Sequence, residues 1–266
     1  MEDPFGSGSI GASFWEVDIR DPRTTSTDLD PISLTTYVVL SEFKPLPIEE
    51  LIIDNTVTPS VKDIIKKIKD GKFGSKLFVQ ILRDIFDTND AINIDIVEEG
   101  LSAGTDGDFT YTKNNLTGSL LFNGSIRINN SYTSTASQDW ILATIIHEMV
   151  HGYIAYNKER VKIGELSQAQ FDRMFPLYAD GADDTDHTQM AYKYVGVIAD
   201  ILQENNANLS RYKALALSRV GLLGNPFFSR NFSQEELDDT TKSNEIGRGT
   251  PPTTTSNSST STQKNC

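Results

Sequence analysis

The chain has 266 residues, of which 38% are hydrophobic and 23% are charged, and its formal net charge at pH 7 is −13. This length and apolar content suffice for one globular domain of ordinary size with additional segments. Nucleic-acid-binding proteins carry basic patches that neutralise phosphates, so the excess of acidic residues argues against nucleic acid as a partner.

The sequence carries no recognisable targeting or membrane-spanning segment. Residues 1–11 have neither a basic region nor an apolar core, and no run of 18 apolar residues occurs. We therefore expect a protein that is cytoplasmic or exported by a non-Sec route, with no membrane partner. The single cysteine, Cys266, excludes a disulfide framework and a cysteine-based zinc site.

The N-terminal third predicts an arm followed by two helices. Residues 1–53 are rich in Gly, Ser, Thr, Asp and Pro and are expected to be extended or loosely docked. The segment 59–70 has isoleucines and a valine at helical spacing, begins with a proline and ends before Gly71. A second apolar stripe predicts a helix over 76–86.

The next part of the chain predicts short strands. Residues 92–96 alternate isoleucine with polar residues, which is typical of a half-buried strand. Residues 100–108 predict a loop. The segment 120–129 predicts two short strands around Asn123 and Gly124, a dipeptide that favours a hairpin turn.

The C-terminal half predicts mainly helices. The first spans 137–156, is capped by Ser137 and is apolar on most sides, so we expect it to be buried at the centre of the fold. Further helices are predicted over 165–175, 187–204 and 210–222.

These elements predict an α+β fold in three parts. An N-terminal arm covers residues 1–53, a central domain covers 54–225 and a tail covers 226–266. The tail is acidic and then rich in Thr, Ser, Asn and Pro. It is expected to be disordered because such a composition cannot bury enough apolar surface.

The most informative motif is HEMVH, at residues 147–151 in the predicted central helix. Helical residues four apart share a face, so His147 and His151 can bind one metal ion while Glu148 projects beside it. Zinc lowers the pKa of a bound water to about 7, and a carboxylate can take its proton as it attacks a carbonyl. A hydrogen-bonded histidine pair is the alternative, but without a metal it would be costly in so apolar a helix.

A catalytic zinc site needs a third protein ligand and an open position. The remaining histidine of the chain, His187, lies 36 residues after His151 at the start of a predicted helix and is the favoured candidate. Asp183, Asp184 and Asp186 are the acidic alternatives.

Two tyrosines follow His187 on the same predicted helix. Tyr192 or Tyr194 could polarise the scissile carbonyl or stabilise the oxyanion. For Tyr194, apolar packing is the favoured role because it shares a stripe with Ala191 and Ile198.

The stretches ATIIHEMVHGYIAY, FDRMFPLY and HTQMAYKYVGVIADIL, within residues 54–206, resemble the HExxH metallopeptidase domain of many Bacteroidota proteins. That domain is similar to SprT-like zincins and to toxin-type metallopeptidases. The resemblance implies a zincin fold, in which a small mixed sheet packs on the active-site helix. It also makes His187 the third ligand and implies a role as a delivered effector or toxin.

The sequence therefore predicts a zincin-like metallopeptidase domain that hydrolyses a protein or peptide substrate with Zn²⁺, using Glu148 as general base. The substrate strand is expected along an exposed sheet edge at residues 125–129. The alternative is a structural or cargo protein with a non-catalytic zinc site, which would normally be closed by a fourth ligand and would need no base. A DNA-associated SprT-like protease is disfavoured by the acidity of the chain.

Overall fold

The computed structural model describes most of the chain beyond residue 50. The described residues are 51–53, 56–70, 72–74, 78, 81, 92–116, 119–180, 185–225 and 230–249. They belong to one compact unit, Lys44–Cys266, whereas a second unit, Met1–Phe43, lies outside them. Most of the predicted arm and most of the predicted helix 76–86 also lie outside the described residues.

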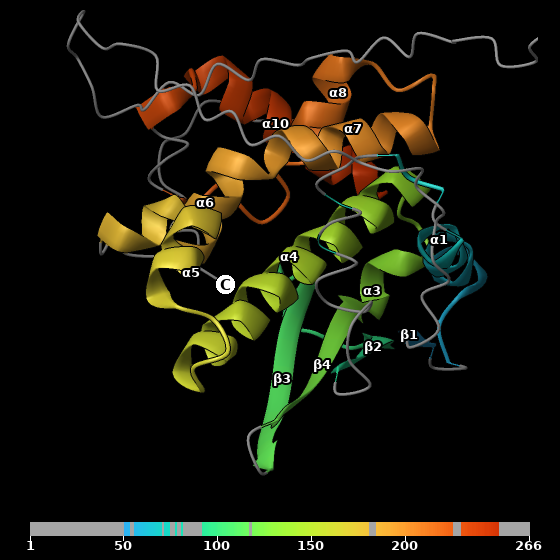
Figure 1. Cartoon of the computed structure of the whole chain (residues 1–266). Helices are drawn as coiled ribbons and strands as arrows, with labels where there is room; N and C mark the ends of the chain where they lie inside the picture. The colour runs from blue at the N-terminus through green and yellow to red at the C-terminus, as the bar shows by residue number, and fades with distance from the viewer. Residues whose placement is uncertain are drawn as a thin grey trace, which may run out of the picture. The chain divides into compact units, whose positions relative to one another are not determined.

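The fold is α+β, as predicted, and is drawn in Figure 1. In chain order the elements are β1 (Leu51–Ile53), α1 (Pro59–Lys69), β2 (Ile92–Glu99), β3 (Gly107–Leu116), β4 (Ser119–Asn129), α3 (Asn130–Thr133), α4 (Gln138–Lys162), α5 (Gln168–Met174), the 3-10 helix η1 (Pro176–Asp180), α6 (Thr185–Lys193), α7 (Val195–Asn205), α8 (Arg211–Leu217) and α10 (Gln234–Gly247). No helix that the structure describes is long and apolar enough to cross a membrane.

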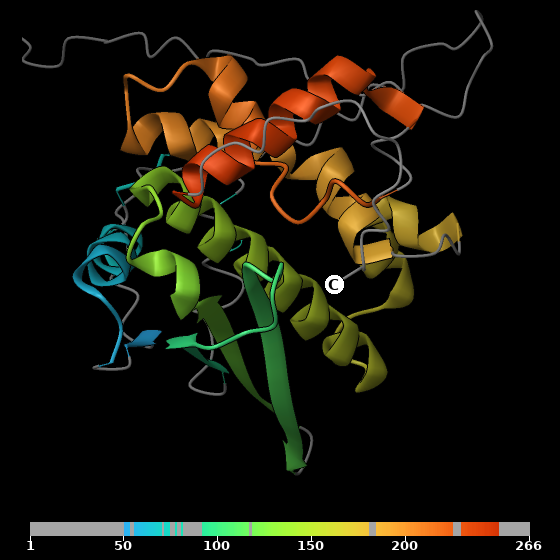
Figure 2. The same ribbon diagram turned by 180° about the vertical axis from the view of Figure 1, so that it is seen from behind.

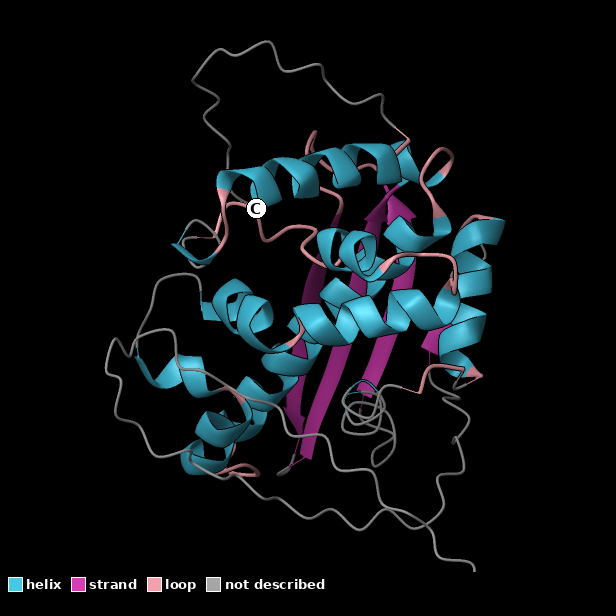
Figure 3. Cartoon of the chain, turned by 90° about the horizontal axis from the view of Figure 1, so that it is seen from above, coloured by secondary structure: helices cyan, strands magenta, loops and turns pink. Residues whose placement is uncertain are grey.

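The described strands form one mixed sheet in the order β1-β2-β4-β3, seen beneath the helices in Figure 3. β2 runs parallel to β1 and to β4, and β3 runs antiparallel to β4 at the edge of the sheet. The alternating isoleucines of β2 place Ile92, Ile94 and Ile96 in the core, which confirms the predicted strand. β4 lies between two partners, so the long edge of this sheet belongs to β3.

The predicted hairpin turn at Asn123 and Gly124 is wrong, because β4 runs through both residues without a break. Gly124 serves a packing purpose instead. A Cβ atom at this position would lie 2.7 Å from Cε2 of Phe109 on β3, and one at Gly152 of α4 would lie 3.0 Å from the same atom. The two glycines thus leave the space that the Phe109 ring fills between sheet and helix.

α4 is the central helix and lies across β3 and β4 (Figure 1). Ser137 caps it as predicted, with its hydroxyl accepting a hydrogen bond from the backbone N–H of Trp140 at 3.2 Å. The helix continues to Lys162, beyond the predicted end at residue 156. Its polar last turns are held by tertiary contacts, because Glu159 accepts hydrogen bonds from Tyr111 and Lys113 of β3.

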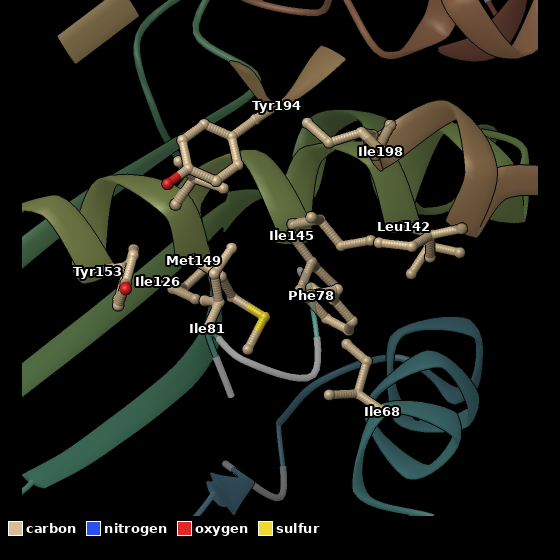
Figure 4. Close-up of a cluster of buried hydrophobic side chains, with 14 of the residues drawn as sticks. Ile68, Phe78, Ile81, Ile126, Leu142, Ile145, Met149, Tyr153, Tyr194 and Ile198 are labelled. Atoms are coloured by element: carbon tan, nitrogen blue, oxygen red, sulfur yellow. The ribbon is translucent and has the colours of Figure 1, made fainter. Parts of the chain in front are cut away.

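The core packs on both sides of α4. In Figure 4, Leu142, Ile145 and Met149 of this helix lie among apolar side chains from the sheet, from α1 and from α7. Tyr194 is fully buried in this core and stands at the N-cap of α7, where the predicted helix 187–204 divides into α6 and α7. The predicted helix 210–222 is likewise shorter, because α8 ends at Leu217 and turns follow it.

The disorder predicted for the tail is wrong for residues 230–249, where the structure has α10; residues 226–229 and 250–266 lie outside the described residues. Figure 2 shows α10 beside α8 and reaching the N-terminal end of α4. Gly247 packs so closely on Trp140 that a Cβ atom would lie 2.7 Å from the indole Cδ1, and its carbonyl accepts a hydrogen bond from Ser137 N–H at 2.7 Å. Arg248 donates to the buried carboxylate of Asp106. The prediction of disorder failed because amino-acid composition carries no information about these tertiary contacts, which stabilise a polar helix.

A chain that ends at residue 232 should therefore be less stable than one that ends at Gly249. Removing α10 uncovers Trp140 and leaves the Asp106 carboxylate without its cationic partner, and breaking a buried pair in this way costs about 3 kcal/mol. In a unit of this size, that loss should lower the melting temperature by roughly 6–12 °C in a thermal unfolding scan. Equal melting temperatures for the two truncated chains would show that α10 adds no stability.

Candidate metal centre

Three histidine side chains converge on one point. His147 and His151 lie one turn apart on α4, and His187 lies in the first turns of α6. The Nε2 atom of His151 is 3.2 Å from Nε2 of His147 and 3.1 Å from Nε2 of His187. One ligand atom from each ring lies within 4.8 Å of the other two, so this group could hold a metal ion. The sequence predicted this set of three.

Hydrogen bonds between the rings explain the convergence poorly. A neutral imidazole nitrogen either donates one proton or offers one lone pair. The Nε2 atom of His151 faces two other Nε2 atoms and cannot satisfy both with a single proton or a single lone pair. One cation at the centre would accept a lone pair from each ring at once.

The environment keeps His147 in the form that binds metals. Its side chain is buried, and burial, together with the neighbouring charges of His151 and His187, lowers its pKa well below the ordinary histidine value. The neutral imidazole is the form that binds metals. At neutral pH, metal binding therefore does not require His147 to release a proton.

Asp186 lies beside the three histidines. It lies near Nδ1 of His151 and is not one of the groups that converge on the centre. Its Oδ2 atom is 3.6 Å from Nδ1 of His151, and its Oδ1 accepts a hydrogen bond from Lys158 Nζ at 2.8 Å. Burial raises the pKa of Asp186, but the interactions with His151 and Lys158 outweigh this effect, so the net pKa is lowered. An anionic carboxylate on Nδ1 orients the ring and directs Nε2 to the centre. The other acidic alternatives, Asp183 and Asp184, lie outside the described residues.

Glu148 is buried next to the histidines and faces β3. Its pKa is raised from 4.5 to about 7, mainly by burial. The charge of His151 lowers the pKa, and the negative charges of Asp108 and Asp106 raise it further. β3 comes so close that a Cβ atom at Gly107 would lie 3.3 Å from Cγ of Glu148 and 2.8 Å from Cγ2 of Thr144. Only glycine fits there, and it brings the strand directly alongside the carboxyl group.

The histidines and Glu148 line a cleft of about 660 Å³. Gly107, Phe109 and Tyr111 in the first half of β3 line it, as do Gly221 and Leu223 in the turns that follow α8 in the chain. Asn244 of α10 and Arg248, the C-cap residue of this helix, also line the cleft. The centre therefore lies on the floor of an open groove.

Two sequence predictions about the surroundings of the site are wrong. Residues 125–129 cannot receive a substrate strand, because β4 is paired on both sides. Neither Tyr192 nor Tyr194 is among the residues that line the cleft, so the polarising role considered for them has no place there. Tyr194 is fully buried in the core, which confirms the apolar packing favoured for it. Tyr111 lines it instead, on a strand that sequence analysis missed although Phe109 and Tyr111 alternate with threonines, a pattern that favours β-structure.

No protein family model, curated protein or solved structure matches this chain. The resemblance to SprT-like zincins thus stays a prediction from the motifs, and a functional proposal has to rest on the geometry of the site.

Gly221→Ala should weaken metal binding more than Gly164→Ala does. Both glycines have a positive φ, +75° and +81°, so alanine should cost each of them about 1–2 kcal/mol of backbone strain. At Gly221 the new Cβ would also lie 3.0 Å from Cε1 of His147, whereas at Gly164 nothing lies within 4 Å. We expect Gly221→Ala to reduce the affinity for Zn²⁺ at least about tenfold in a competitive chelator titration. Equal affinities in the two variants would show that the Gly221 wall does not position His147.

Glu148→Gln should stabilise the metal-free protein at pH 8 more than at pH 5. A folded-state pKa of about 7 against an ordinary 4.5 means that the folded protein holds the proton more tightly than the unfolded chain. Stability is therefore lost as pH rises from 4.5 to 7, by on the order of 3 kcal/mol. Glutamine removes this loss, so urea unfolding should give a large difference between the proteins at pH 8 and a small one at pH 5. If the difference in unfolding free energy between the two proteins did not change with pH, the Glu148 carboxyl would not have a raised pKa.

Proposed function

We propose that this protein is a zinc-dependent metallopeptidase with a zincin-like fold, in which His147, His151 and His187 hold Zn²⁺ and Glu148 is the general base. The observation that carries the proposal is the convergence of the three histidines beside a buried carboxyl group, on the floor of an open cleft.

The distances fit zinc. Zn–N bonds of 2.0–2.1 Å in a tetrahedron would separate the nitrogens by about 3.3 Å. The two close Nε2 pairs are 3.2 Å and 3.1 Å apart. Three imidazoles and no thiolate form a donor set typical of catalytic zinc, which keeps its fourth position open for water or substrate.

Bound Zn²⁺ would act as a Lewis acid that lowers the pKa of water to about 7 and polarises a carbonyl. The protein supplies the proton transfers. Glu148, whose pKa is raised by burial in the metal-free protein, would accept a proton from the attacking water at one carboxyl oxygen and then donate it to the leaving amine nitrogen of the peptide. Asp186 keeps the ring of His151 oriented, and the Gly221 wall packs on the ring of His147.

A peptide substrate would lie along β3. This strand forms the edge of the sheet that the structure describes, and its residues Gly107, Phe109 and Tyr111 line the cleft beside Glu148. An extended peptide can extend a sheet edge through main-chain hydrogen bonds, which would hold the scissile bond at the floor of the cleft.

The alternative, a structural or cargo protein with a non-catalytic zinc site, is less well supported. A structural site is normally closed by a fourth protein ligand and has no use for a base. Among the described residues the group comprises three histidines, and Glu148 is buried beside it at the cost of a raised pKa. Such an arrangement suits catalysis rather than stability.

The purified protein should contain about one zinc per chain, and Glu148→Gln should keep the metal but lose hydrolysis of an unstructured protein such as casein by about 10²–10⁴-fold. His187→Ala should lose zinc affinity by orders of magnitude because only two ligands remain. Asp186→Ala should lose about 10–100-fold because it orients a ligand. Metal analysis and a protease assay on the same preparations would measure these effects.

Two outcomes would reject the proposal. If the wild type neither retains nor can be loaded with zinc or a comparable divalent ion, there is no metal centre. If the zinc-loaded wild type and Glu148→Gln hydrolyse protein at the same rate, Glu148 is not the base.

A further inference from the structure

Tyr111 is an aromatic side chain that the fold exposes inside the cleft. It is 40% exposed, and of the large hydrophobic side chains that are exposed in the described residues, Tyr111, Tyr212 and Ile246, it is the one that lines the cleft. The ring lies on the outer strand of the described sheet, in the same cleft as the three histidines.

The ring is held rigidly from below. It stacks on Phe122 of β4, with ring centroids 4.9 Å apart and planes 20° apart, and Phe122 in turn packs edge-on against Tyr156 of α4. The phenol O–H donates to Glu159 at 3.1 Å. Two other partners, Lys113 and Lys162, also donate to this buried carboxylate, so Glu159 is charge-compensated and fixed. Tyr111 is therefore a preorganised platform rather than a mobile surface side chain.

Two other apolar side chains, Phe109 and Ala155, line the same cleft as Tyr111. Ala155 of α4 lies one turn after His151 on the helix and lines the same cleft, and Phe109 lies two residues before Tyr111 on the same face of β3. Phe109 and Tyr111 are themselves roughly parallel, with centroids 6.1 Å apart. Because side chains on one face of a strand recur every second residue, a peptide paired with β3 would place one side chain next to Tyr111.

We propose that the cleft has a substrate subsite formed by Tyr111, Phe109 and Ala155, and that it selects peptides with an aromatic side chain at the position that lies against Tyr111. This inference rests on the proposed function and names its substrate class. A Phe, Tyr or Trp side chain would extend the stack of Tyr111 on Phe122 and cover the exposed ring. A small aliphatic side chain would leave the Tyr111 ring partly exposed and would gain less from the contact.

A purely structural role accounts for less of the geometry. The stack on Phe122 and the hydrogen bond to Glu159 fasten β3 to α4, and a phenylalanine buried more deeply could supply the stacking. Neither contact explains why the ring is exposed into the groove that holds the three histidines. A ring positioned by two elements and open toward the site fits a specificity determinant.

The test uses the full-length, zinc-loaded protein and a mixture of random peptides whose cleavage products are sequenced by mass spectrometry. We expect Phe, Tyr and Trp to be enriched at one position near the scissile bond, with kcat/KM at least about tenfold above that for Ala at this position. Tyr111→Phe should keep the preference because it keeps the ring. Tyr111→Ala should abolish it. Tyr111→Thr serves as a second variant with high strand propensity, in case the alanine variant does not fold.

Tyr212→Ala is the matched control. Tyr212 is also exposed and also donates to a carboxylate, that of Asp239, but it lies on α8 and does not line the cleft. It should leave the cleavage profile unchanged. A preference that survives both Tyr111→Ala and Tyr111→Thr, or the absence of an aromatic preference at every position, would overturn the inference while leaving the metallopeptidase proposal intact.

A binding measurement tests the Tyr111 subsite even if the protein does not hydrolyse peptides. The ligands are alanine tripeptides that carry a hydroxamate at one end or the other, together with variants in which phenylalanine replaces each alanine in turn. Each ligand is titrated into the zinc-loaded protein by calorimetry. One phenylalanine position should bind about tenfold more tightly than alanine, and Tyr111→Ala should remove the gain. If this holds for a protein that cleaves no peptide, the subsite stands and the hydrolytic function fails. If no phenylalanine position binds more tightly, the subsite fails.

Discussion

The whole arrangement depends on burying polar groups in an apolar helix. α4 is enclosed on nearly every side, yet it carries His147 and Glu148 at 4% and 5% exposure. Isolated polar groups would be costly there, so each must meet a partner. The imidazoles meet His187, which α6 brings from another part of the chain, and Glu148 responds with a pKa near 7. The cost of burying a charge in this helix thus raises the proton affinity of the Glu148 carboxyl in the metal-free protein.

The closeness of β3 to α4 determines the form of the cleft. Glycines at positions 107, 124 and 152 remove the Cβ atoms that would hold the strand away, and the Phe109 ring fills the remaining gap. At the far end, Glu159 fastens the strand to the helix through Tyr111 and Lys113. The same contacts that position the sheet edge beside Glu148 also fix the aromatic platform. The packing of the sheet edge and the proposed substrate selection would therefore depend on one interface.

α10 extends this logic to a polar segment. Its Arg248 is paired with Asp106, immediately before Gly107, so the start of β3 is held from α10 as well as from α4. Asn129 supports the same point, since its side chain donates to the carbonyl of Thr105 at 2.7 Å. Because Asn244 and Arg248 line the cleft, α10 belongs to the wall of the site.

Local patterns in the sequence determined the helices 59–70 and 137–156, the strand at 92–96, and the three histidines, because periodicity and ligand spacing are short-range properties. The tertiary structure decided the rest. Gly124 could mark a turn or leave room for a ring, and only the position of Phe109 distinguishes the two. The polar residues of α10 indicate disorder by composition, yet Trp140 and Asp106, distant in sequence, order them. Which strand is the edge, and hence which tyrosine lines the cleft, follows from strand order, and strand order depends on pairings between residues far apart in the chain.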